Sequence, residues 1–176
     1  MRRIDILVAL FLLLSTLLLG ACAPVAPANQ TAGSSTPQDT SDRKTIVVTY
    51  SILGAIVKDL VGDAAQVVVV MPNGQDPHEW EPSAKDIETI NGADLVVQNG
   101  LELEGGMAKA LEQAHTQGVA FFTASDFIPV RKVGEGEGIP SGDPDQALGA
   151  EDPHLWLDPI DMKLIVTALA EAVKTD

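Results

Sequence analysis

The sequence predicts an α/β fold, in which a parallel four-stranded sheet carries helices on both faces. From residue 45 onwards, short β-branched segments alternate with segments whose apolar residues recur at helical spacing. Gly, Asn and Pro residues lie between these segments, where they favour turns. This alternation is typical of parallel strands joined by right-handed crossover helices.

Each element has its own signal along the chain. The predicted strands are β-branched or continuously apolar, and they cover residues 45–51, 66–71, 94–98 and 119–123. The second strand (QVVVVM) does not alternate, so we expect it to be buried on both faces. The predicted helices have apolar spacing near 3.6 residues, and they cover residues 53–60, 84–90, 103–115 and 159–174. Ser83 is a predicted N-cap, and Asn91-Gly92 ends the helix that it begins.

The N-terminal segment is expected to lie outside this fold. Residues 6–19 are almost wholly apolar and follow two arginines, but a helix of fourteen residues reaches only roughly 21 Å, short of a hydrocarbon core of about 30 Å. Residues 1–21 are therefore predicted to be an export signal. Leu19-Gly20-Ala21-Cys22 resembles the bacterial lipobox, which implies cleavage before Cys22 and lipid attachment to it. Residues 22–44, rich in Pro, Ser, Thr and Ala, are the expected flexible tether.

Composition excludes several classes of function. The chain of 176 residues has 11 basic and 25 acidic residues, a formal charge of −14, and this argues against nucleic-acid binding. A single cysteine excludes a disulfide scaffold and a Cys-rich metal cluster. Residues 131–150, which hold five Gly and two Pro, read as a mobile surface loop. Chemistry must come from His, carboxylates or backbone groups.

One motif occurs twice and uses scarce residue types. Asp76-Pro77-His78-Glu79-Trp80 recurs as Asp152-Pro153-His154-Leu155-Trp156, so the two copies hold both tryptophans and two of the three histidines. Proline stiffens the backbone that enters each imidazole, and neutral imidazole is the commonest metal ligand in proteins. We therefore predict that His78 and His154 bind a metal ion. Asp76 and Asp152 are candidates to accept a hydrogen bond from these imidazoles, since a ligating His usually donates its other N–H to an acceptor.

The remaining scarce residues are expected to be structural. His115 lies in the last turn of a predicted helix, where a cation suits the helix dipole. Both tryptophans are expected to pack around the site, because an indole N–H donates and cannot ligate a metal. Since ligands bind at the carboxyl ends of parallel strands, the first copy, which follows the second strand, is well placed to bind one.

The whole pattern resembles the zinc- and manganese-binding receptors of bacterial metal-uptake ABC transporters. The resemblance rests on the lipobox and tether, on residues 71–82 (MPNGQDPHEWEP), on residues 93–104 (ADLVVQNGLELE) and on residues 151–159 (EDPHLWLDP). It departs from the family at Gly105-Gly106, where a bulky residue is usual, and this should affect local packing more than ligation.

This resemblance implies a fold and a function. Residues 45–160 would form the N-terminal lobe of a two-lobed binding protein, with residues 161–176 beginning a following helix and the chain incomplete relative to the family. One Zn²⁺ or Mn²⁺ would be shared with a third ligand (His or Glu) and a fourth (Asp or Glu) beyond Asp176. The loop at residues 131–150 lacks the His-rich stretch of many zinc members, which admits manganese. The receptor would be a monomer outside the cytoplasm, lipid-anchored to the bacterial membrane, delivering metal to a permease and its ATPase without catalysis.

Two other functions fit parts of the pattern. A membrane-tethered, metal-dependent hydrolase would use His78 and His154 with Glu79 as general base, but it needs a third ligand within this chain. A surface adhesin or interaction module would need no metal.

Overall fold

The computed structural model describes residues 43–137 and 144–174, and every structural statement below refers to these residues. The predicted signal peptide at residues 1–21, the lipid attachment site at Cys22 and all but the last two residues of the predicted tether lie outside them.

The described residues form one parallel four-stranded sheet, as the sequence predicts. The strands, in the spatial order β2-β1-β3-β4, are β1 (Thr45–Val48), β2 (Gln66–Val69), β3 (Leu95–Gln98) and β4 (Ala120–Thr123). The central strands are the most buried, because both their edges are paired and both their faces are covered. Alternate residues of β1 enter different core clusters: Ile46 and Val48 lie in one and Val47 lies in the other.

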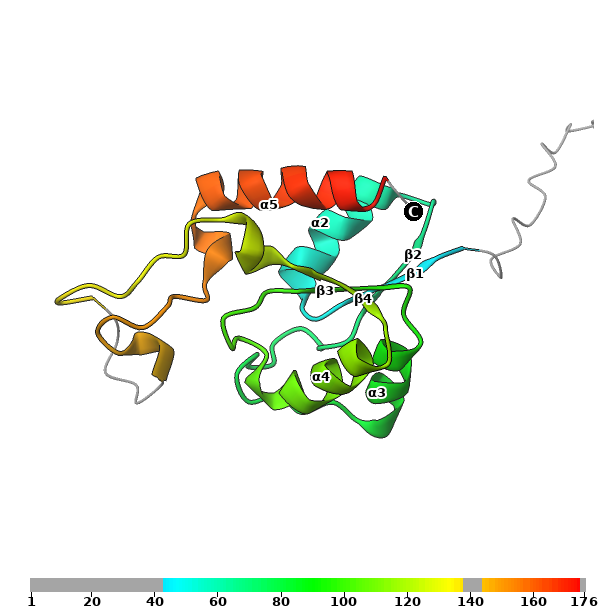
Figure 1. Cartoon of the computed structure of the whole chain (residues 1–176), viewed down its shortest axis with the longest axis horizontal. Coiled ribbons are helices and arrows are strands. Elements are labelled where there is room, and N and C mark those ends of the chain that lie inside the picture. The colour runs from blue at the N-terminus through cyan, green and yellow to red at the C-terminus, as the bar shows by residue number, and fades with distance from the viewer. Residues whose placement is uncertain (1–42, 138–143, 175–176) are drawn as a thin grey trace, which may run out of the picture. The chain divides into compact units, whose positions relative to one another are not determined.

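Helices cover both faces of this sheet (Figure 1). One face carries α2 (Ser51–Val61) and α5 (Pro159–Ala172), and the other carries α3 (Ala84–Asn91) and α4 (Ala108–Thr116). Leu53, Ile165 and Leu169 are fully buried on the first side, while Ile90 and Ala114 are fully buried on the second. The predicted class, a parallel sheet with helices on both faces, is thus confirmed.

The start of α3 shows how local sequence sets an element boundary. The Ser83 hydroxyl accepts the Asp86 backbone N–H at 3.3 Å, and the Asp86 carboxylate accepts the Ser83 backbone N–H at 2.9 Å. This reciprocal capping box satisfies two amide groups that a helix N-terminus leaves without intrahelical partners. The helix ends at Asn91, before Gly92. Both boundaries were predicted.

Two sequence expectations need correction. β2 lies at the edge of the sheet, and Val67, Val68 and Val69 are only half-buried, because one edge of the strand has no neighbour. The helix expected over residues 103–115 begins only at Ala108, after a 3-10 turn, η3 (Gly105–Met107). The helix expected over residues 159–174 is confirmed: it runs from Pro159 to Ala172 and packs into the core.

The late start of α4 has a backbone cause. Leu101 and Glu102, with φ of 55° and 60°, follow Gly100, whose φ is 86°, so three consecutive residues adopt left-handed geometry. Glu104, inside the expected helix, then has φ of −87° and ψ of 42°, outside the helical region, so a regular helix can begin only after it. Among the described residues, no helix combines the length and the apolar character needed to cross a membrane.

Candidate metal site

The two copies of the repeated motif come together in space. His78 lies in the loop between β2 and α3, and His154 lies directly before the 3-10 turn η6 (Leu155–Leu157). Their ring centroids are 6.1 Å apart. The side chains are 30% and 28% exposed, so solvent and a small ion can reach both rings.

Each copy makes the same turn around its proline. Asp76 Oδ1 accepts the backbone N–H of His78 at 2.9 Å, and Asp152 Oδ1 accepts the backbone N–H of His154 at 3.1 Å. An Asp side chain that binds the backbone two residues ahead stabilises a tight turn without help from the rest of the fold. The repeated Asp-Pro pair therefore fixes the direction in which each imidazole leaves the backbone.

The two aspartates differ in their contact with the rings. Asp152 Oδ1 also lies 2.7 Å from His154 Nδ1, which leaves His154 Nε2 as the ring nitrogen available to a ligand. Its other oxygen accepts a hydrogen bond from Arg131 at 2.7 Å. Burial acts to raise the pKa of Asp152, but the His154 and Arg131 contacts outweigh it and hold that pKa below its usual value. Asp152 is thus an ionised acceptor behind an imidazole, whereas Asp76 contacts the backbone of its histidine.

The second copy is anchored to the carboxyl edge of the sheet. Asn99, the residue after β3, donates from Nδ2 to the Pro153 carbonyl at 2.9 Å and accepts from the Tyr50 hydroxyl at 2.9 Å. Trp156 lies edge-on to the His154 ring and packs against Tyr50, with centroids 5.4 Å apart in both pairs. The tryptophan therefore packs beside the site, as predicted.

The first copy is held by the glycine pair after β3. A Cβ added at Gly106 would lie 2.3 Å from the Trp80 carbonyl oxygen, and one added at Gly105 would lie 3.2 Å from the His78 carbonyl oxygen. The backbone of this loop can approach η3 so closely because Gly106 has no side chain, and a Cβ at Gly105 would require a smaller shift. Gly105-Gly106, where the family usually has a bulky residue, therefore affects the packing of the loop that carries His78.

A buried carboxylate braces the same region. Glu104 accepts the Thr49 hydroxyl at 2.8 Å, the Asn99 backbone N–H at 2.7 Å and the Gly100 backbone N–H at 3.3 Å. Burial raises the pKa of Glu104, and these hydrogen bonds offset only part of that rise. Glu104 thus ties the left-handed turn to the end of β1.

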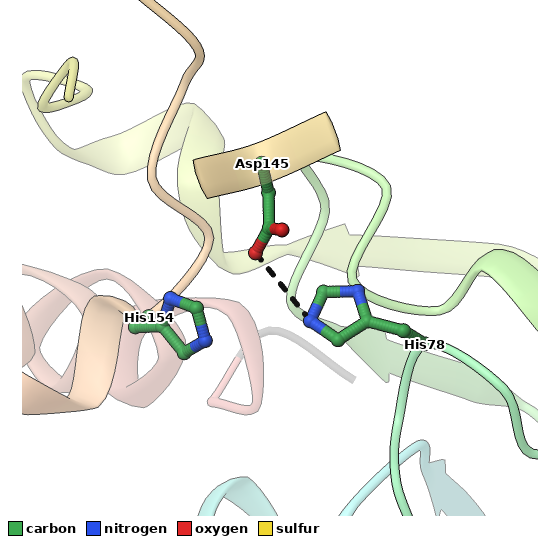
Figure 2. Close-up of side chains that lie close together, drawn as sticks. All are labelled: His78, Asp145 and His154. Carbon is green, nitrogen blue, oxygen red and sulfur yellow. Dashed lines mark ion pairs between the residues drawn. The ribbon is translucent and has the colours of Figure 1, made fainter. Parts of the chain in front are cut away.

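The structure adds a residue that the sequence interpretation missed. Asp145, in the 3-10 turn η5 (Pro144–Gln146), lies with its Oδ2 3.5 Å from His78 Nε2 (Figure 2). One potential ligand atom from each of His78, Asp145 and His154 lies within 4.8 Å of the other two. Figure 2 shows the carboxylate projecting from η5 towards the two imidazoles. Two nitrogens and one carboxylate oxygen form a donor set that suits Zn²⁺ and Mn²⁺ alike.

A sequence signal for Asp145 existed. The triplet Asp143-Pro144-Asp145 repeats the Asp-Pro step of both histidine motifs, with a carboxylate in the place of the imidazole. The surrounding glycines and acids are typical of a surface loop, and they hid this further Asp-Pro step.

An open cleft of about 1100 Å³ adjoins the site. His78 and Asp145 line it, together with Glu102, Glu112, Asp126 and Glu151 from its remaining walls. Several negatively charged side chains around one cleft attract cations. His115 also lines the cleft, where its ring lies edge-on to Phe121 with centroids 5.5 Å apart, and it takes no part in the cluster.

The fold and the donor atoms define a class: an α/β domain whose sheet edge gathers the ligand types of a divalent-metal site. The family model described as zinc-uptake complex component A, periplasmic (ZnuA) matches residues 46–175. The chain belongs to this family.

Similar proteins agree on the type of protein and differ in the metal that they name. The manganese ABC transporter substrate-binding lipoprotein PsaA of Streptococcus pneumoniae serotype 4 is 35% identical over 90% of this chain and 46% of its own length. The iron ABC transporter substrate-binding lipoprotein MtsA of Streptococcus pyogenes serotype M1 is 35% identical over 89% of this chain and 46% of its own. The periplasmic zinc-binding protein TroA of Treponema pallidum, 25% identical, superposes with a TM-score of 0.61 over 74% of this chain and 43% of its own. This chain spans about half the length of the curated relatives it matches.

Proposed function

We propose that this chain belongs to an extracytoplasmic solute-binding lipoprotein that captures a divalent metal ion and delivers it to an ABC transporter for import. His78 and His154 bind the ion in this proposal. The observation that carries it is the meeting of two Asp-Pro-His motifs, far apart in sequence, at the carboxyl edge of one parallel sheet. Family membership and the names of the relatives support it.

The proposed ligands suit a divalent first-row transition metal but do not determine which one. Two imidazoles suit zinc, and the general affinity order places zinc above manganese at almost any nitrogen-containing site. The relatives are named for manganese, iron and zinc, so membership of the family does not fix the metal. We propose Zn²⁺ or Mn²⁺ as the cargo, with further ligands from a second lobe.

Capture and delivery are separate steps in this proposal. Both imidazoles are partly exposed, so a second lobe can close over the ion, and the loaded form then docks on a permease whose ATPase supplies the energy for import. The protein is a monomer in this proposal, anchored outside the cytoplasm by lipid on Cys22, since the relatives are named lipoproteins. Asp152 supports His154 through its ring nitrogen, and Asp76 supports His78 through its backbone. Catalysis is given no part, because the relatives are named as binding components of transporters.

The test is calorimetric titration of the purified chain with Zn²⁺ and with Mn²⁺. Wild type should bind one ion saturably, and the double variant His78→Ala/His154→Ala should lose this binding. His115→Ala is the matched control, because it removes the chain's third imidazole from the same cleft and leaves the cluster intact.

The same samples separate the other functions. Unchanged binding in the double variant would contradict the site, and no binding to wild type would contradict metal capture by this chain. Hydrolysis of an activated ester or phosphodiester by the metal-loaded chain, above the rate of the free metal and lost in the double variant, would instead support a metal-dependent hydrolase.

A further inference from the structure

We propose that Asp145 is a third ligand to the metal, so that this domain holds the ion through two imidazoles and one carboxylate of its own chain. The inference rests on the proposed function, because it assigns a further ligand at the same site. It makes the turn η5 part of the binding machinery.

The carboxylate is poorly satisfied by the protein alone. The Asp145 side chain is 13% exposed, and its Oδ1 is buried without a hydrogen-bond partner among the described residues. Its Oδ2 accepts a hydrogen bond from Gln146 Nε2 at 3.3 Å and lies 3.5 Å from His78 Nε2. A carboxylate with a buried, unpaired oxygen is costly unless a cation or a donor compensates it. A metal ion between the imidazoles would supply that compensation.

The distances suit direct ligation. With metal–ligand bonds of about 2.0–2.1 Å, two ligand atoms of a tetrahedral zinc site lie about 3.4 Å apart. His78 Nε2 and Asp145 Oδ2 are 3.5 Å apart, which already matches. The three ligand atoms lie within 4.8 Å of one another, so the cluster needs only a small side-chain contraction to close around an ion.

The three proposed ligands share a sequence context. Each follows an Asp-Pro pair, and each comes from a segment that turns sharply: the loop after β2, the turn η5 and the start of η6. Three ligands on one domain would hold the ion before a second lobe closes on it, and they would leave at least one coordination position open. A carboxylate oxygen is a harder Lewis base than an imidazole nitrogen. Adding one therefore raises the affinity for manganese relative to a site of imidazoles only.

The first experiment measures Zn²⁺ and Mn²⁺ affinity in the full chain carrying Asp145→Asn. Asp126→Asn is the matched control, because Asp126 is an exposed aspartate that lines the same cleft outside the cluster. Loss of a residue that merely supports a ligand costs 10–100-fold in metal affinity, so loss of Asp145 should weaken binding by about 100-fold or more, with Asp126→Asn within about twofold of wild type. Asp145→His, which keeps a ligand atom, should recover at least about tenfold of the lost zinc affinity.

The second experiment asks whether residue 145 touches the ion. In Asp145→Cys loaded with Co²⁺, a thiolate-to-cobalt charge-transfer absorption should appear that is absent from wild type, which shares Cys22, and from Asp126→Cys. Weakened binding without this absorption and without rescue by Asp145→His would overturn direct ligation. Equal affinities of Asp145→Asn and Asp126→Asn would overturn any role for Asp145, while loss of binding in His78→Ala/His154→Ala would leave the proposed function standing. No saturable binding to wild type would overturn both proposals.

Discussion

Asp76 and Asp152 hold equivalent places in the repeated motif, and the structure gives them different contacts. Both accept the backbone N–H of the histidine two residues ahead, but Asp152 also lies against the ring of its histidine. Arg131, which contacts both Asp152 and Glu137, fixes the far side of this carboxylate. The ring of His154 therefore has a defined orientation and a defined free nitrogen, set by a chain of polar contacts.

A residue-scale prediction follows from this difference. Asp152→Ala should weaken Zn²⁺ and Mn²⁺ binding by about 10–100-fold, because the His154 ring loses the acceptor that orients it. Asp76→Ala removes an equivalent turn contact without removing a ring contact, so it is the matched control and should have a smaller effect. Calorimetric titration of both variants measures the difference. Equal losses would show that both aspartates act through the turn alone.

At the scale of elements, the site depends on how closely two turns approach. The loop that carries His78 packs on η3 through the backbone of Trp80, and Gly106 is the point of contact. Next to it, the left-handed turn at residues 100–102 is tied down by Glu104. Left-handed backbone at non-glycine residues costs about 1–2 kcal/mol per residue, so the surrounding hydrogen bonds must hold it in place.

Gly106→Ala tests this contact. A methyl group would lie 2.3 Å from the Trp80 carbonyl oxygen, a rigid backbone atom, so the loop must shift. We expect a loss of about 1–3 kcal/mol in the free energy of unfolding, the usual cost of overpacking, together with weaker metal binding. Gly92→Ala is the control, because its nearest contact would be an ordinary 3.4 Å and its φ is −93°. Urea unfolding and titration measure the two effects, and a Gly106→Ala variant as stable as Gly92→Ala would contradict the packing argument.

At the scale of the whole molecule, polar groups gather at the carboxyl edge of the sheet, and some of them are buried. Glu104 is the clearest case, since burial raises its pKa above its ordinary value of 4.5. The folded chain therefore binds this proton more tightly than the unfolded chain does. Stability from this group is fully present below pH 4.5 and is lost as pH rises through the folded-state pKa.

Glu104→Gln tests this dependence of stability on pH. The amide oxygen can still accept the hydrogen bonds from Thr49 and Asn99, while the ionisable group is gone. The free energy of unfolding of wild type minus that of Glu104→Gln should therefore fall as pH rises from about 4.5. Glu112→Gln, at an exposed glutamate of the same cleft, is the control. A difference that stays constant or rises with pH would contradict the raised pKa.

The sequence by itself determined the class of fold, because strand and helix periodicities and capping residues act over a few neighbours. The Ser83 capping box and the stop at Gly92 are examples. It also singled out His78 and His154, because a rare motif that occurs twice is visible without coordinates; their role as ligands remains a prediction. The edge position of β2 and the late start of α4 were not predicted, since strand order and the left-handed turn depend on contacts between distant segments.

Tertiary structure alone decided which carboxylate meets the imidazoles. Asp145 is one of 25 acidic residues and lies in a segment without periodicity, so only the fold distinguishes it. The same holds for Asn99, which ties Pro153 to the end of β3 across 54 residues of sequence. Local patterns fix how a short segment turns, whereas the distance between two turns is set by the packing of the whole sheet and its helices.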